Sequence, residues 1–145
     1  GGPVRFLIDV VGYYAAGDDG ALFYPLDPVR AYDSRPTMGG AGPLEPLEQR
    51  VISVIGAPAG APMVPVGATA VAFNLTVTGT TSMGHLRIYP AHALLPDASV
   101  LNWPGASYSR ANASIVQIPA DRNVRVYNGS GTRADVVVDL IGYYP

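Results

Sequence analysis

The side chains that could perform acid–base or metal chemistry are few in this sequence and far apart. The 145 residues include eleven Asp and Glu and two His. General acid–base catalysis needs two carboxylates, or a His with an orienting acid, held close together. The acids are scattered, and His85 and His92 have no third ligand at a spacing that metal sites use. We therefore predict that the protein is not an enzyme and has no catalytic residues, metal or cofactor.

Motifs for nucleophilic or phosphate chemistry also lack their usual context. Ser34, Ser82 and Ser114 are not placed as a nucleophile elbow requires, between a strand and a helix with flanking glycines. The glycine-rich residues 39–42 are followed by neither a helix nor a Lys, which a phosphate-binding loop needs. The formal charge of −2 gives no positive field for nucleic acid or anionic lipid. We expect no nucleic-acid partner.

Aromatic residues give one indication of ligand binding. Trp103 is the single Trp, next to Asn102 and shortly before Tyr108. An exposed Trp with a Tyr and an amide nearby can stack on a sugar ring and hold its hydroxyls. This pattern supports a carbohydrate-binding module, appended to a secreted hydrolase or a cell-wall protein and binding polysaccharide. The other interpretation is that Trp103 caps the core at a strand end.

Two acids stand among aliphatic residues in stretches that otherwise read as strands. They are Asp9 and Asp139. A carboxylate that faces inward from a central strand must be paired, because an isolated buried charge costs several kcal/mol. We expect Arg35 to pair with Asp139 in a structural ion pair, with Arg30 as the second choice. The alternative is that Asp139 faces solvent from an edge strand.

These acids belong to a stretch that occurs twice. Residues 5–14 read RFLIDVVGYY, and residues 135–144 read DVVVDLIGYY, so that Asp, Gly and both Tyr recur after 130 positions. A run rich in Val and Ile that ends at Gly is typical of a β-strand. Its recurrence indicates a repeated module that ends in this strand. We call residues 5–14 the N-terminal copy.

The elements that must position these residues are short strands separated by turns. The chain has 17 Gly and 14 Pro, and they fall between apolar runs. Residues 51–84 carry no charge, but prolines and glycines interrupt them, so we expect no membrane span. Hydrophobic residues make up 48% of the chain, enough for a core. There is no Cys, so disulfides are excluded.

The alternation of apolar and polar residues predicts eight or nine strands and no substantial helix. Residues 68–78 alternate most clearly, with Val71, Phe73, Leu75 and Val77 on one face. Two prolines make the first half of residues 23–35 an edge segment, and Asn128-Gly129 predicts a hairpin. The other strands are expected over residues 5–14, 47–55, 85–89, 98–103, 114–118, 124–127 and 135–144. The predicted fold is all-β: a single antiparallel β-sandwich, jelly-roll or Ig-like, with long Pro/Gly-rich loops.

Three segments together carry a resemblance to a known type of module. They are PLDPVRAYDSR at residues 25–35, AVAFNLTV at residues 70–77 and VDLIGYY at residues 138–144. The chain resembles, over about residues 22–145, a β-rich repeat of secreted and surface proteins of high-GC bacteria, actinobacteria especially. This resemblance implies an extracellular, non-catalytic accessory or repeat module. It gives no functional residues to carry over.

The organisation that follows has two parts. Residues 1–20 hold an N-terminal strand and a linker, and residues 21–145 form the sandwich module. The N-terminal copy is either the end of a preceding repeat or a donor-type strand. It would pair with an exposed sheet edge of its own domain or of a neighbouring chain, through Phe6, Ile8, Val10 and Tyr13.

The function expected from this organisation is that of a structural protein. We expect a secreted or cell-surface module of a repeat protein or fibre, serving adhesion, spacing or fibre assembly by strand addition. Its partners would be copies of itself or neighbouring repeats.

Overall fold

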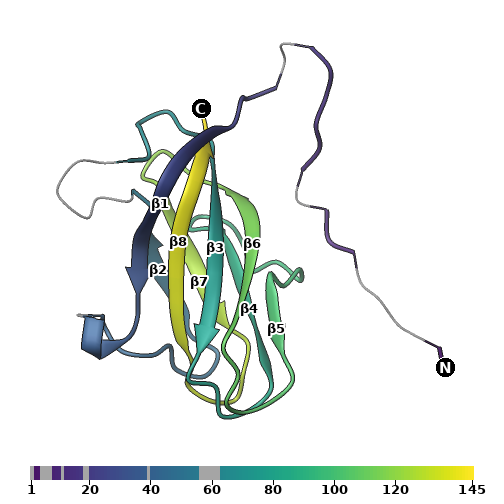
Figure 1. Ribbon diagram of the computed structural model, residues 1–145, viewed down its shortest axis with the longest axis vertical. Coiled ribbons are helices and arrows are strands. Elements are labelled where there is room, and N and C mark those ends of the chain that lie inside the picture. The colour runs from purple at the N-terminus through teal and green to yellow at the C-terminus, as the bar shows by residue number, and fades with distance from the viewer. Residues whose placement is uncertain (1, 4–7, 11, 18–19, 39, 56–62) are drawn as a thin grey trace.

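The chain folds into one β-sandwich. The computed structural model describes residues 2–3, 8–10, 12–17, 20–38, 40–55 and 63–145, and Figure 1 shows its two layers. The strands are β1 Tyr24–Asp33, β2 Gln49–Ser53, β3 Ala70–Thr78, β4 Gly84–Pro90, β5 Leu101–Trp103, β6 Arg110–Gln117, β7 Asn123–Asn128 and β8 Asp135–Tyr144, with one 3₁₀ turn, η1, at Pro36–Met38. In these residues no helix has the length and hydrophobicity to cross a membrane. The predicted all-β sandwich without substantial helix is confirmed.

The strand order makes the sandwich a jelly roll. One sheet has the order β1-β8-β3-β6 and the other β2-β7-β4-β5. All strand pairs are antiparallel, and first pairs with last, second with second-last and so on inward. A long hairpin rolled up in this way gives the two Greek keys of a jelly roll. Of the two topologies expected from the sequence, the Ig-like one is therefore wrong.

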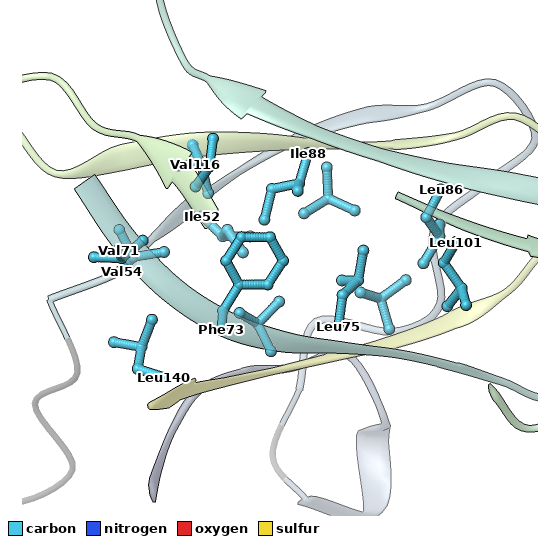
Figure 2. Close-up of a cluster of buried hydrophobic side chains, with 14 of the residues drawn as sticks. Ile52, Val54, Val71, Phe73, Leu75, Leu86, Ile88, Leu101, Val116 and Leu140 are labelled. Atoms are coloured by element: carbon cyan, nitrogen blue, oxygen red, sulfur yellow. The ribbon is translucent and has the colours of Figure 1, made fainter. Parts of the chain in front are cut away.

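The core lies between the sheets and is built on the alternation of β3. Val71, Phe73, Leu75 and Val77 are all fully buried, as their spacing predicts. Figure 2 shows Phe73 in the middle of this cluster, with side chains of both sheets around it. Because these residues point to one side of the strand, the opposite face of the β1–β8–β3–β6 sheet is left for smaller and polar side chains.

The two edges of the β1–β8–β3–β6 sheet differ in regularity. β1 contains Pro25 and Pro28, and its pairing with β8 shifts register twice, so its place at an edge follows from the missing N–H groups. β6 pairs with β3 in eight consecutive residue pairs without a register shift. The sequence predicted strand only over residues 114–118, and the structure begins β6 earlier, so that residues 110–113 are also strand.

Two expectations about local pairing are wrong. Asn128-Gly129 does not close a hairpin, because β7 and β8 belong to different sheets. The Asn128 side chain is buried and donates to the carbonyl oxygens of Glu45 and Thr132, at 3.0 and 2.8 Å, which fixes a crossing between sheets. The second concerns residues 8–10 and 12–14 of the N-terminal copy, which are not in a strand.

Candidate functional site

β8 occupies a central position in its sheet. β8 pairs with β1 on one side and with β3 on the other. Its inward side chains Val136, Val138 and Leu140 are fully buried. An extra residue, Ile141, makes a bulge against β3, so that Tyr143 packs on the core with these residues. We call the space between β1 and β3 the β8 slot.

An aromatic cluster closes one end of the β8 slot and depends on a glycine. The Phe23 ring lies over Gly142, where an added Cβ would be 2.2 Å from a Phe23 ring carbon and 2.7 Å from the Tyr24 carbonyl oxygen. Tyr24 stacks on Tyr143 with ring centroids 5.4 Å apart, and Phe23 is the same distance from Tyr144. Position 142 therefore has to be glycine.

Four charged side chains line the outer face of the β8 slot. Asp139 pairs with Arg30, which lies directly opposite it in the β1–β8 register. Asp33 receives Arg30 and Arg35, each at 2.6 Å. The predicted pair between Asp139 and Arg35 is wrong, because Arg35 lies beyond the end of β1 and turns back onto Asp33. Asp139 is thus paired, but on the outer face rather than in the core.

These contacts set the titration of Asp33. Hydrogen bonds from the Arg35 side chain, with smaller contributions from the Arg35 N–H and the charge of Arg30, lower the pKa of Asp33 to about 2, although burial opposes them. The carboxylate is 7% exposed, so it is shielded from water while it stays ionised at neutral pH. We call Arg30, Asp33, Arg35 and Asp139 the charge ladder, and its role is to hold β1 against β8.

The N-terminal copy has the sequence pattern of β8, but its described residues have the opposite surroundings. Ile8, Val10 and Tyr13, three of the residues expected to carry pairing, are 77%, 84% and 90% exposed. Phe6 lies outside the described residues. By sequence, Ile8, Val10 and Tyr13 correspond to Val138, Leu140 and Tyr143, which face the core. The copy therefore has the pattern of a buried strand without, in its described residues, the burial.

Gly12 sharpens this contrast. It corresponds to Gly142, yet an added Cβ at Gly12 would meet no atom within 4 Å, and the φ angle of Gly12 is not in the left-handed region. Neither space nor backbone conformation explains glycine there. A β8-type environment, with an aromatic ring over the glycine, does explain it.

Two residues of the N-terminal copy, Asp9 and Tyr14, line a groove of about 660 Å³ on the β1–β8–β3–β6 sheet. The groove is also lined by residues 112–115 of β6, by residues 98–100, and by Phe23, Ala72, Ile141 and Tyr144. Figure 1 shows the described residues before β1 outside both sheets, on the side of β6. Burial, with the Tyr14 hydroxyl as a smaller cause, raises the pKa of Tyr144. Among the described residues of the N-terminal copy, Asp9 and Tyr14 are thus the ones that line this groove.

Among the sheet edges, β6 offers the most backbone to an added strand. It has eight residues, no proline and no bulge. Arg110 to Ala113 are exposed, and in the described residues its pairing is with β3 alone. β2 and β5 have five and three residues, and β1 is interrupted by prolines. A strand of eight to ten residues therefore fits β6 best.

The predicted glycan platform is not formed. Trp103 is 3% exposed, and its indole N–H donates to the Ser82 carbonyl oxygen at 2.6 Å. Asn102 is exposed and donates to Ser99, while Tyr108 packs on the core with the Arg110 guanidinium 4.9 Å from its ring centroid. The alternative expectation, Trp103 as a core residue, is correct.

Sequence reasoning missed two features that the structure supplies. The first is Phe23, whose ring lies where a side chain at position 142 would be. The sequence indicated a constraint on this glycine only by repeating it, with the two Tyr that follow, at both ends of the chain. The second is the length of β6, for which the signal was weak because residues 111–113 read Ala-Asn-Ala. For Trp103, alternation with Leu101 was the available signal for burial.

Among the described ranges, no group of three His, Asp or Glu is placed to hold a metal ion. Comparison with known proteins adds no identity: no family model matches the chain, and no curated protein matches it.

Proposed function

We propose that this chain is a non-catalytic structural or interaction module of an extracellular repeat surface protein or fibre, and that its N-terminal copy mediates assembly by strand addition. The observation that carries the proposal is the exposure of Ile8, Val10 and Tyr13 in a segment with the sequence of a buried strand. Burial of exposed aliphatic and aromatic side chains is favourable, because it removes apolar surface from water.

A free edge of matching length supports strand addition. Main-chain hydrogen bonds to β6 would supply affinity, and alternate side chains of the added strand would supply specificity. Ten extended residues reach about 33 Å, more than the length of β6. An added strand would continue the β1–β8–β3–β6 sheet by one position.

The location follows from the same proposal. A surface or fibre protein acts outside the cell, and repeated modules joined by short linkers give reach and regular spacing. Partners would be copies of this chain or neighbouring repeats. Binding of polysaccharide loses its support, because Trp103 is in the core.

The test compares the full chain with residues 15–145, which retain all eight strands. We expect the full chain to form oligomers or filaments in negative-stain images and the shortened chain to be monomeric by light scattering. The full-length variant Ile8→Asp/Val10→Asp is the matched control, since it keeps the chain length and removes the apolar face. Assembly that persists unchanged in both variants contradicts the proposal.

A further inference from the structure

Edge addition does not account for every residue of the N-terminal copy. A strand added to the edge of β6 could carry Val or Ile at position 12, because β-branched residues favour strands and glycine weakens them. Gly12 instead recurs together with Asp9, Tyr13 and Tyr14. Each of these four has a counterpart in β8 whose contacts are known.

The β8 slot gives each of the four residues a reason. Asp9 would take the place of Asp139 opposite Arg30. Gly12 would take the place of Gly142 beneath Phe23. Tyr13 and Tyr14 would take the places of Tyr143 on Tyr24 and of Tyr144 beside Phe23.

The direction of the chain also fits. β8 runs antiparallel to β1, and the N-terminal copy directly precedes β1 in the sequence. A reversal within residues 15–23 would place the copy antiparallel to β1, as one arm of a hairpin. Figure 1 shows its described residues leading toward the end of the sandwich where β1 begins and β8 ends.

We propose that the β8 slot is a binding site for the N-terminal copy of the same chain as well as for β8, so that two strands compete for one position. The inference rests on the proposed function in one respect: it takes residues 5–14 as a β8-type strand. It differs in the site that it assigns to them, a slot between two strands instead of an edge. The strand left out is then the one available to a neighbouring copy.

The residues that differ between the two strands explain why β8 holds the slot in this structure. Val136 is fully buried, and its counterpart in the sequence is Phe6, whose larger side chain would overpack the core. Asp135 accepts a hydrogen bond from the Ser34 hydroxyl at 2.7 Å, and its counterpart is Arg5, which cannot accept one. The copy is a weaker occupant, held in place by the same partners.

The experiment disables β8 in the full chain and asks whether the copy replaces it. In Gly142→Val the new side chain collides with Phe23 and the Tyr24 backbone, which expels β8. We expect this variant to remain a folded monomer with a lowered melting temperature. Amide exchange at residues 8–14 should slow about a hundredfold or more, while exchange at residues 135–144 becomes fast.

The double variant Gly12→Val/Gly142→Val removes both occupants and should lose its cooperative melting transition. Gly12→Val alone is the matched control and should melt as the wild type does, because the Gly12 site is open. The proposal that the two strands compete for the β8 slot is contradicted if Gly142→Val and the double variant melt alike, whether both are folded or both unfolded. It is also overturned if Gly142→Val folds only as a dimer, since the donor would then be another chain.

This outcome is separate from that of the assembly test. Wild-type oligomers that disappear when residues 1–14 are removed would support the proposed function even if Gly142→Val simply unfolds. A chain that is always monomeric, but in which the N-terminal copy replaces β8 in Gly142→Val, would support the competition for the β8 slot and contradict the proposed assembly.

Discussion

β8 and the N-terminal copy are two regions with nearly the same pattern and opposite surroundings. Val138 and Leu140 are fully buried between two partner strands, whereas Ile8 and Val10 are 77% and 84% exposed. Local propensity is alike in the two, so it cannot be what separates them. The difference shows that a strand-forming sequence is able to pair, but that its surroundings decide where it pairs. At the β8 slot these surroundings are two flanking strands, the aromatic cluster and Arg30.

The largest contrast is expected from placing a charge on each strand. Val138→Asp, measured in residues 15–145 so that the N-terminal copy cannot replace β8, buries a carboxylate in the core and should cost about 3–5 kcal/mol. Ile8→Asp should leave the free energy of unfolding within about 0.5 kcal/mol of the wild type. Urea denaturation followed by circular dichroism measures both. Equal losses would mean that the N-terminal copy is packed on the module in solution.

A cavity tests the same comparison with a smaller change. Leu140→Ala should destabilise the module by about 2–5 kcal/mol, because the fully buried side chain leaves a void. Val10→Ala should have almost no effect on stability and should weaken assembly. Thermal melts of dilute protein give the first result, and light scattering of concentrated protein gives the second. If Val10→Ala lowers the melting temperature of dilute protein appreciably, the contrast fails.

Acid should lower the stability of the module through the charge ladder at the β8 slot, which has no counterpart contact at the described residues of the N-terminal copy. The pKa of Asp33 is lowered from 3.8 to about 2 in the folded protein. A lowered carboxyl pKa contributes stability above the unfolded value, and this contribution is lost as the pH falls through the folded value. We expect the stability of the wild type to fall between about pH 4 and pH 2. Asp33→Asn should flatten that part of the profile, and an unchanged slope would remove Asp33 from the account.

The smallest effect is expected at the cross-strand ion pair. Arg30→Ala should cost roughly 0.5–1 kcal/mol, since the Arg30 side chain is partly exposed and water screens the pair. Asp9→Asn, at the corresponding position of the N-terminal copy, should cost nothing in the dilute monomer. A double-mutant cycle of Arg30→Ala with Asp139→Asn isolates the pair, and a coupling energy near zero would show that register does not depend on it.

Much of the fold could be predicted from the alternation of apolar and polar residues, because a strand that buries one face has an apolar residue at every second position. Val71, Phe73, Leu75 and Val77 were placed correctly in this way. The jelly-roll order could not be predicted, since β1 and β8 are paired across more than a hundred residues of sequence.

The candidate site shows the same division between local and long-range information. The recurrence of Asp, Gly and two Tyr was visible in the sequence, but its physical reason was not. The Phe23 ring over Gly142 and the choice of Arg30 over Arg35 both depend on the β1–β8 register. Trp103 was open to two interpretations because exposure is a property of the packed sandwich.

Amide hydrogen exchange at residues 8–14 of the wild-type chain, measured over a range of protein concentrations, tests most directly whether the N-terminal copy is a strand that waits for a partner. We expect fast exchange in dilute protein and slow exchange in concentrated protein, as the copy becomes paired in assemblies. Exchange that stays fast at every concentration, or that is already slow in the dilute monomer, would contradict it.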